Sequence, residues 1–461
     1  MSFDRDARTA LADGQLRGAL RHATTLFGER RRAAIADVPD WEDARDRARA
    51  IKDETLLHLD RYLEQFVANA EGAGARVHWA RDAAQACDII AGIAERRGAR
   101  TVVKSKSMAS EEIRLNAALA ARGIAAVETD LGEYIVQLAG EEPSHIVVPA
   151  IHKTKGQIAA LFAAKLGMEP SDDVTRLAAA ARQALRRRFA EADLGVSGVN
   201  FAVAETGTIL ILENEGNARL TTSLPRTHVA LMGIEKVIPR FADLEVFLRL
   251  LPRSGTGQAL TAYQSLLTGT KRRPVDEGPE ELHIVLLDNG RSRMLASPVT
   301  RQTLACIRCG ACLNACPVYR QIGGHAYGSV YPGPIGAVLT PQLLGMGESA
   351  ELPYASSLCG ACRDVCPVKI DIPAVLLHLR AQTVARRASI GTRALLERLA
   401  FSAYAAVMAR PRLFEWVMGC ARRLHIVPPL GAWTKWRDLR PLAPRSFREE
   451  WRAGLRETEG S

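Results

Sequence analysis

The sequence predicts an α/β domain, then a shorter cysteine-rich segment, then a helical C-terminal region. Strand and helix patterns alternate between residues 72 and 297, and seven of the nine cysteines lie between Cys306 and Cys366. Helical patterns return after that segment, and 461 residues correspond to about three domains. The expected regions are 1–71 (N-terminal helical region), 72–297 (α/β domain), 298–380 (cysteine-rich domain) and 381–461 (basic C-terminal region).

Composition excludes several classes of protein. Hydrophobic residues make up 47% of the chain and charged residues 24%, which is typical of a globular protein rather than a disordered one. No apolar run approaches the ~20 residues that a membrane-spanning helix needs. The N-terminus mixes acids and bases and lacks the apolar core of a signal peptide. We therefore expect a cytoplasmic protein.

The positive charge is concentrated at the C-terminal end. The formal net charge is +10, and residues 380–461 hold 16 basic and 7 acidic residues, a net of +9. The rest of the chain is almost neutral, so we do not expect nucleic acid as a partner. In the tail, Trp433, Trp436 and Trp451 are interleaved with arginines, which suits stacking on nucleic-acid bases but equally suits docking to an acidic partner or peripheral contact with a membrane surface.

Periodicity and capping signals predict the individual elements. Residues 1–70 are poor in β-branched residues, and apolar positions between Ile51 and Phe66 recur at helical spacing. Ser110 is the expected N-cap of a helix that ends at Arg122, and Asp288-Asn289-Gly290 favours a hairpin turn. The other expected elements are strands at Arg100–Val103, Ile124–Val127, His145–Ala150, Val229–Met232, Lys236–Ile238 and Leu282–Leu287, two strands within Val199–Leu212, and helices at Gln157–Leu166, Ile372–Ala388 and Thr392–Met408.

The first cysteine motif is Cys306-x2-Cys309-x2-Cys312-x3-Cys316, followed by proline. This is the spacing of bacterial two-cluster ferredoxins, in which three cysteines bind one cluster and the cysteine before proline binds the other. Gly310 leaves room for the backbone to approach the cluster. A zinc site, in contrast, prefers two separated Cys-x2-Cys pairs. The spacing therefore predicts iron–sulfur clusters.

The second motif, Cys359-x2-Cys362-x3-Cys366, has Ser356 where the template has its first cysteine. The crossed rule assigns Cys306, Cys309, Cys312 and Cys366 to cluster 1, and Cys316, Cys359 and Cys362 to cluster 2. We expect two [4Fe-4S] clusters, of which the second has three thiolates only. Its fourth corner is the Ser356 oxygen, another side chain, water, or nothing, as in a [3Fe-4S] cluster.

Two cysteines lie outside the motifs. Cys87 and Cys420 each occur in an apolar helical pattern. Free cysteine is among the most buried residue types, so both are predicted to belong to the hydrophobic core.

Several long stretches carry a family resemblance. They are VVKSKSMASEEIRLN (102–116), ETDLGEYIVQLAGEEPSHIVVPAIHK (128–153), AETGTILILENEGNARL (204–220), the two cysteine motifs and GAWTKWRDLRPLAPRSF (431–447). With these stretches, nearly the whole chain resembles the iron–sulfur (B) subunits of the bacterial L-lactate utilisation system.

The resemblance implies a fold and a function. The α/β domain would be a lactate-utilisation domain, similar in fold to sugar-phosphate isomerases and CoA transferases, followed by a ferredoxin-like two-cluster segment with the same seven cysteine ligands. The chain would transfer electrons during oxidation of L-lactate to pyruvate, allowing lactate to serve as a carbon source, without itself being the catalyst. The implied partners are the other lactate-utilisation subunits and an unidentified electron acceptor.

The α/β domain also contains candidates for a pocket that binds a small anion. They are Lys104, Lys106, Asn214, Asn217 and the turn Glu205-Thr206-Gly207-Thr208, although lysines and glycines equally suit solvated loops and tight turns. An alternative function is therefore a lyase or isomerase that uses this pocket or an open iron of cluster 2. A redox-sensing nucleic-acid-binding regulator is a further alternative, but the sequence has no recognisable DNA-binding motif.

Overall fold

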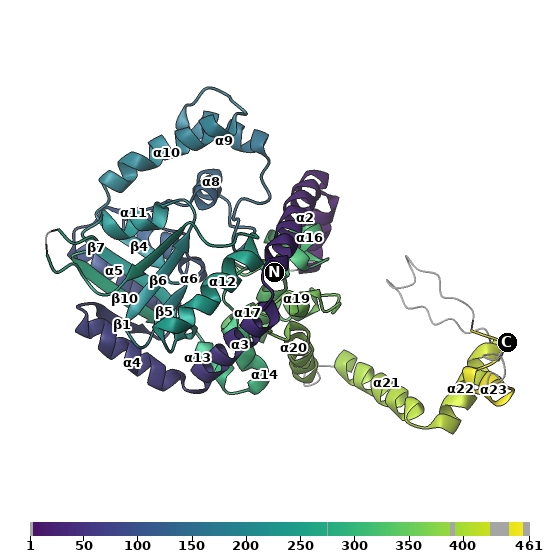
Figure 1. Cartoon of the computed structure of the whole chain (residues 1–461). Coiled ribbons are helices and arrows are strands. Elements are labelled where there is room, and N and C mark those ends of the chain that lie inside the picture. The colour runs from purple at the N-terminus through teal and green to yellow at the C-terminus, as the bar shows by residue number, and fades with distance from the viewer. Residues whose placement is uncertain (1–2, 274, 388–391, 425–441, 455–461) are drawn as a thin grey trace. The chain divides into compact units, whose positions relative to one another are not determined.

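The computed structural model describes residues 3–273, 275–387, 392–424 and 442–454 (Figure 1). The chain divides into two compact units, Met1–Ala381 and Gln382–Ser461. The first unit contains the α/β domain and the cysteine-rich segment, and the second contains the basic C-terminal region.

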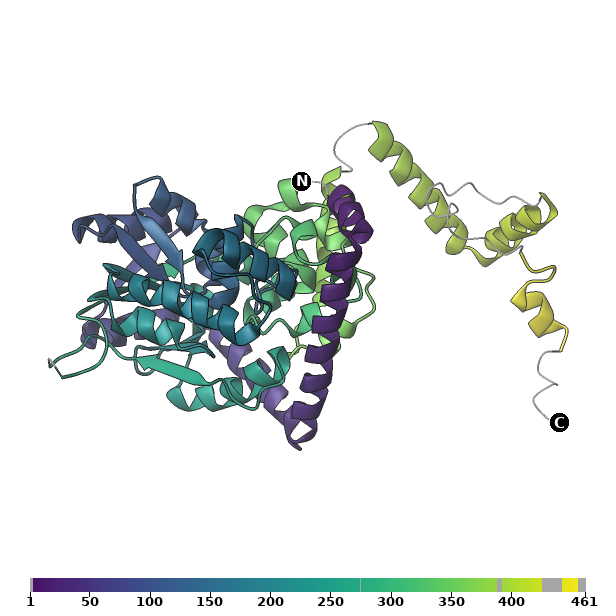
Figure 2. The ribbon, with the colours of Figure 1, turned by 90° about the horizontal axis from the view of Figure 1, so that it is seen from above.

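Four helices precede the first strand, as the sequence predicts. They are α1 (Phe3–Ala12), α2 (Gly14–Ala36), α3 (Trp41–Leu57) and α4 (Leu59–Gly72). Asp13 caps α2 by accepting a hydrogen bond from the Leu16 amide. The long helix α2 runs beside the cysteine-rich segment in Figure 2 and contacts α15 (Ala311–Ala315) and α16 (Tyr319–Ile322), whereas α4 contacts β1 (Arg76–Ala80). The N-terminal helices therefore join the two parts of the first unit.

Six parallel strands form the main sheet, in the order β1-β10-β7-β4-β2-β3. Their bounds are β2 (Thr101–Lys104), β3 (Ala125–Glu128), β4 (Leu194–Gly198), β7 (Thr227–Gly233) and β10 (Glu281–Leu287). All seven residues of β7 are buried, because a parallel sheet of this kind is covered on both faces. The predicted strands at Arg100–Val103, Ile124–Val127, Val229–Met232 and Leu282–Leu287 are thus confirmed.

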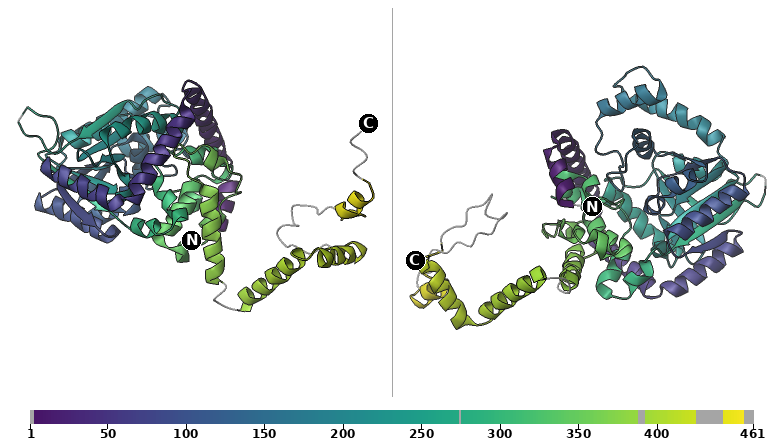
Figure 3. Two further views of the ribbon diagram at one scale, coloured as in Figure 1. Left: turned by 60° about the horizontal axis from the view of Figure 1, so that its bottom comes forward. Right: turned by 180° about the vertical axis from the view of Figure 1, so that it is seen from behind.

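Helices and a second sheet cover the two faces of the main sheet (Figures 1 and 3). On one face, α5 (Ala83–Arg96) and α7 (Leu115–Ala120) pack through Ile90 and Leu119 against Val102 and its neighbours. On the other face, α4 packs through Phe66 beside a sheet of order β8-β5-β6-β9. These strands are β5 (Phe201–Val203), β6 (Thr208–Glu213), β8 (Val237–Ile238) and β9 (Tyr263–Leu267).

The remaining elements of the first unit are helical. In the α/β domain they are α6 (Met108–Glu112), α8 (Leu131–Ala139), α9 (Lys155–Leu166), α10 (Val174–Ala190), α11 (Asn217–Ser223), α12 (Leu244–Gly255) and the 3-10 turns η1 (Ile234–Lys236) and η2 (Phe241–Asp243). The chain then continues through α13 (Arg291–Leu295), α14 (Pro298–Arg301), η3 (Gln302–Ala305), η4 (His325–Tyr327), α17 (Gly333–Leu344), α18 (Met346–Ser349), η5 (Leu352–Tyr354) and α19 (Ala361–Asp364) to α20 (Ile372–Arg387), whose last residues belong to the second unit. Because α15 contacts α19, the two cysteine motifs lie together.

The predicted strand at His145–Ala150 is wrong. The segment forms turns, and Nδ1 of His145 accepts hydrogen bonds from the amides of Val147 (3.0 Å) and Val148 (3.1 Å). A side chain that binds two neighbouring amides removes the donors that a strand needs for pairing.

Two further local predictions, one of a helix cap and one of a hairpin turn, are also wrong. Ser107, not Ser110, caps α6 by accepting from the Ser110 amide, and Arg114 (φ 53°) separates α6 from α7 in place of one continuous helix. Within Asp288-Asn289-Gly290, the last two residues adopt positive φ angles, as in a tight turn. This turn leads from β10 into α13 rather than into a second strand of a hairpin. β10 already has parallel neighbours on both sides, so it has no free edge for a hairpin.

The second unit consists of helices. They are α21 (Thr392–Met408), α22 (Pro411–Leu424) and α23 (Phe447–Arg452), with an ion pair of 3.0 Å between Arg422 and Glu449. Cys420 is only half-buried, so the prediction that it lies in a core is wrong, whereas Cys87 is buried as predicted. Trp433 and Trp436 lie outside the described residues. No helix in the described part of the chain combines the length and the apolar character that a bilayer crossing requires.

Candidate functional site

The first cysteine motif forms a tight loop between η3 and α15. Arg308 (φ 61°) and Gly310 (φ 77°) both adopt left-handed backbone conformations, which turn the chain back on itself. A Cβ atom at Gly310 would lie 3.0 Å from the Val147 side chain and 3.1 Å from His145. The loop therefore packs closely on the turn that replaces the predicted strand.

Four cysteines from the two motifs surround one small cavity. Its lining includes Cys306, Cys309 and Cys312 from the first motif and Cys366 from the second, together with apolar side chains such as Ile335 and Ile370. Cys316, Cys359 and Cys362 do not line it. No three His, Cys, Asp or Glu side chains of the described residues form a group that could hold a single metal ion. The cavity is nevertheless lined by four cysteines, which is the number of thiolate ligands that a [4Fe-4S] cluster takes.

Backbone amides donate hydrogen bonds to three of the cysteine sulfurs. The Arg308 amide lies 3.4 Å from Cys306 Sγ, the Ile370 amide 3.3 Å from Cys366 Sγ and the Tyr319 amide 3.5 Å from Cys316 Sγ. Such N–H···S contacts stabilise thiolates and are one of the factors that set the reduction potential of a cluster.

Cys316, Cys359 and Cys362 form a second, more exposed group. Cys316 and Cys362 are buried, and Cys359 is exposed. Burial, together with the neighbouring Cys316 and Cys359, raises the pKa of the Cys362 thiol to about 12. Burial likewise raises the pKa of Cys366 to about 11, with Cys306 as a further cause. A positively charged partner such as iron would favour the ionised form of these two buried thiols.

Ser356 occupies a backbone position equivalent to that of Cys306. Leu358 (φ 57°) and Gly360 (φ 87°) repeat the left-handed pair found in the first motif. The Leu358 amide donates to Ser356 Oγ at 3.1 Å, as the Arg308 amide donates to the first cysteine. The serine hydroxyl is thus placed where the template has a thiolate.

The N-terminal helices hold the loop around Cys366. Arg45 of α3 donates to the backbone oxygens of Cys366 (2.8 Å) and Asp364 (2.9 Å). Arg31 of α2 donates to the Val365 oxygen at 3.2 Å, and Arg49 donates to the Lys369 oxygen at 2.9 Å. These arginines were not predicted as site residues, because no local sequence pattern connects them with a cysteine more than 300 positions away.

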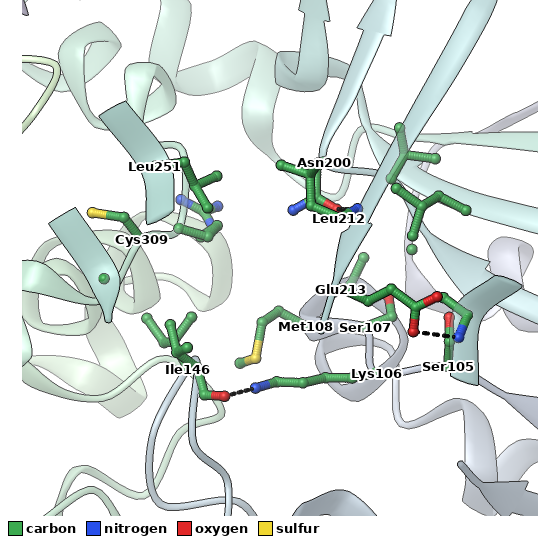
Figure 4. Close-up of a pocket in the computed structure, with 18 of the residues that line it drawn as sticks. Ser105, Lys106, Ser107, Met108, Ile146, Asn200, Leu212, Glu213, Leu251 and Cys309 are labelled. Atoms are coloured by element: carbon green, nitrogen blue, oxygen red, sulfur yellow. Dashed lines mark hydrogen bonds between the residues drawn. The ribbon is translucent and has the colours of Figure 1, made fainter. Parts of the chain in front are cut away.

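The predicted anion pocket is partly correct. Lys106, Asn214 and Asn217 line a cavity of about 340 Å³ (Figure 4). Lys104 does not, because it is buried in ion pairs with Glu128 (2.7 Å) and Glu111. The turn Glu205–Thr208 lies elsewhere, against α4, where Asn69 donates to the Ala204 oxygen at 2.8 Å.

A network of buried charges connects this cavity with the first cysteine motif. Arg291 pairs with Glu112 (2.7 Å) and Glu235 (2.6 Å), and Arg308 pairs with Glu235 (3.2 Å). Burial disfavours ionisation of Glu235, but the two guanidinium groups overcome it and hold the pKa at about 2. Burial and the neighbouring Arg308 lower the pKa of Lys236 to about 8, against the opposing charges of Glu235 and Cys306.

Comparison with known proteins agrees with this architecture. The LUD domain family matches residues 63–287, the 4Fe-4S dicluster domain matches residues 302–370, and the family "Lactate utilisation protein B, C-terminal" matches residues 381–454. The fold and site thus define a LUD-domain protein with an iron–sulfur dicluster domain.

Curated relatives match the chain from end to end. "Lactate utilization protein B" of Shouchella clausii is 43% identical over 471 residues, covering 100% of this chain and 98% of the relative. "Uncharacterized electron transport protein YkgF" of Escherichia coli K12 is 43% identical over 461 residues, covering 98% and 95%. The chain belongs to the lactate utilization protein B family. A crystal structure of a DUF162 family protein from Deinococcus radiodurans covers 50% of this chain and 98% of its own at 13% identity, and its TM-score of 0.26 is too low to assign a fold.

Proposed function

We propose that this protein is an iron–sulfur electron carrier in the oxidation of L-lactate to pyruvate, which allows lactate to be used as a carbon source. The observation that carries the proposal is the cavity lined by Cys306, Cys309, Cys312 and Cys366, because it joins cysteines of both motifs in the manner of a two-cluster ferredoxin. The names of the curated relatives support the link to lactate use and to electron transport.

The proposed ligands follow the crossed rule. Cluster 1, a [4Fe-4S] cluster, is bound by Cys306, Cys309, Cys312 and Cys366, and cluster 2 by Cys316, Cys359 and Cys362. For cluster 2 we propose a [4Fe-4S] cluster with the Ser356 oxygen at its fourth corner, since that hydroxyl occupies the position of the missing thiolate. Oxygen is a harder ligand than thiolate, so this iron is the one most easily lost, which leaves a [3Fe-4S] cluster.

Two clusters suit the electron count of the reaction. Oxidation of L-lactate to pyruvate releases two electrons and two protons, and each cluster accepts one electron. The two electrons then pass from the clusters to an acceptor outside the chain. The other lactate-utilisation subunits are the proposed partners in this transfer, and the chain is proposed to act in the cytoplasm.

The second unit is proposed to dock the chain to one of these subunits. It carries most of the net positive charge and exposes large apolar side chains on α21 and α22, among them Leu396, Phe401 and Trp416. Charge attraction to an acidic subunit should weaken as salt reduces the screening length to ~8 Å. A binding series against the purified subunits and against anionic vesicles tests this: salt-independent binding, or binding to vesicles alone, contradicts the proposal.

Growth on L-lactate tests the main proposal. A strain that lacks the gene should fail to grow on L-lactate, should grow normally on pyruvate, and should recover with the wild-type gene but not with Cys309→Ser. Cys87→Ser, which changes a buried cysteine outside both motifs, is the matched control and should restore growth. Normal growth of the deletion strain on L-lactate would overturn the proposal.

A further inference from the structure

The largest cavity described above lies at the carboxyl edge of the main sheet. Its walls come from the segments that follow β2 (Ser105 to Ala109), β4 (Gly198 to Asn200), β7 (Glu235 and Lys236) and β10 (Arg291). The chain leaves β2 towards α6 and α7 on one face of the sheet, and it leaves β4 towards β5 on the other face. Neighbouring strands whose connections diverge in this way create a crevice, which is the usual ligand site of an open α/β sheet.

The cysteine-rich segment closes one side of this crevice. Arg308 and Cys309 line the cavity, and both also line the smaller cavity that the four cysteines surround. Figure 4 shows Cys309 and Leu251 on one side of the cavity, while Lys106 extends from the loop after β2 towards Ile146. A ligand in the crevice would therefore lie next to cluster 1.

Two cationic groups at this side of the cavity have unused donors. Arg291 uses its guanidinium on Glu112 and Glu235, whereas Arg308 donates to Glu235 through Nη2 and its guanidinium also interacts with Cys306 and lies over the ring of Tyr331. The Arg308 side chain is only 8% exposed, and its Nη1 is buried without a hydrogen-bond partner. Lys236 makes no hydrogen bond or ion pair with any of the residues that the structure describes. The buried Nη1 of Arg308 is costly unless an acceptor satisfies it, whereas Lys236 is half-buried and offers its ammonium group at the edge of the cavity.

The acidic groups of the cavity, in contrast, are already in use. Asp130 caps α8, Glu213 accepts from the first amides of α11, and Glu215 accepts from the Leu131 amide at 2.9 Å. Lys106 donates to the Val147 oxygen. Ser105, which is 2% exposed, has no partner for its hydroxyl. The groups left for a ligand are thus two cations and a hydroxyl.

We propose that this cavity binds a small organic acid anion, whose carboxylate is held by Arg308 and Lys236 and whose oxygen substituent faces the Ser105 hydroxyl. The preference for a singly charged anion follows from the cavity, since its remaining acidic groups would repel a second negative charge. The choice of a 2-hydroxy or 2-oxo acid rests on the proposed function. Because Cys309 lines both cavities, the bound acid would lie on the opposite side of Cys309 from cluster 1. The isolated chain is expected to bind the acid without oxidising it.

Binding to the full-length, anaerobically reconstituted protein tests this proposal. Calorimetry would use L-lactate, pyruvate and inorganic phosphate as probes. We expect L-lactate or pyruvate to bind and to shift the resonance spectrum of reduced cluster 1. Lys236→Met should weaken binding by about tenfold or more, because it removes a charge-assisted hydrogen bond.

Lys52→Met is the matched control. Lys52 is also a cation near Glu235, to whose backbone oxygen it donates at 2.5 Å, but it does not line the cavity. If the cations serve only to offset the charge of the cluster, the two variants should behave alike. If Lys236 holds a ligand, Lys52→Met should leave the affinity within about twofold, since it removes no contact with the anion.

Several outcomes would overturn the proposal. They are no binding of either carboxylate, binding of phosphate alone, and equal effects of the two lysine variants. Where Lys236→Met fails to fold, Ser105→Ala provides the second test, because its hydroxyl has no partner to lose and its removal should still weaken binding severalfold. Carboxylate binding in a protein whose deletion leaves growth on L-lactate intact would refute the proposed function while leaving the binding site in place.

Discussion

The pair Cys366→Ser and Cys316→Ser provides the sharpest test of crossed ligation. Each substitution removes one thiol from one motif. Under crossed ligation, the cluster that is lost is the one bound mainly by the cysteines of the other motif. Cys366 lies on the cavity of the first motif, so its loss should remove cluster 1. Cys316 lies with the exposed Cys359 and the buried Cys362, so its loss should remove cluster 2.

The expected magnitude is about half of the bound iron. Two cubanes contain about eight irons per chain, so each variant should retain roughly four. The loop that carries Cys366 should stay in place, because Arg45 holds its backbone oxygen at 2.8 Å and serine leaves that contact intact. The two variants should therefore retain the same amount of iron but different clusters.

Mild oxidation distinguishes the two remaining clusters. Cys359 is exposed and cluster 2 is expected to have an oxygen ligand, so the cluster left in Cys366→Ser should convert to a three-iron form with its characteristic resonance signal. The cluster left in Cys316→Ser should survive the same treatment, and Cys87→Ser should retain the full iron content. If Cys366→Ser kept the resistant cluster and lost the labile one, crossed ligation would be refuted.

Three further predictions address single residues. Ser356→Cys should prevent formation of the three-iron signal after mild oxidation, and persistence of that signal would show that this position does not contact the cluster. Arg291→Met leaves Glu112 and Glu235 buried without their main partner and should destabilise the protein by about 3–5 kcal/mol, so an unchanged melting temperature would contradict the role of this pair. Burial lowers the pKa of His228 from 6.5 to about 4, so folding stability should be lost as pH falls below 6.5, by up to about 3 kcal/mol, and His228→Gln should reduce the pH dependence of the melting temperature.

The cysteine motifs were predictable because their spacing is local. Three thiols that must reach corners of one cluster have to come from one tight loop, so the sequence alone indicates the chemistry. The order of strands and helices was predictable for the same reason, since hydrophobic period and capping residues are local signals. His145 shows where this fails: its ring binds the amides of Val147 and Val148, and no apolar pattern reveals a side chain that replaces strand pairing.

Residues that act across the fold were not predictable in this way. Arg31 and Arg45 reach the second motif from helices near the N-terminus, and in the sequence they look like any solvated helix charges. Lys104 was expected in a pocket, but its ammonium group is enclosed by Glu111 and Glu128. Lys236 was predicted to begin the strand Lys236–Ile238, but it ends the turn η1 just beyond β7, where ligands of parallel sheets bind.

The buried charges explain why the two parts of the first unit act together. Glu235 follows β7, Arg291 follows β10, and Arg308 belongs to the first cysteine motif, so one carboxylate joins the sheet edge to the cluster loop. A Cβ at Gly233 would lie 2.1 Å from Glu235 Oε2, so only glycine allows this close approach. Buried ion pairs of this kind add little to stability compared with well-packed hydrophobic side chains, but they determine which segments of the chain pack against each other. Here they hold the Cys309 loop against the crevice of the sheet, so that Cys309 lines both the cavity of the α/β domain and the cavity between the cysteine motifs.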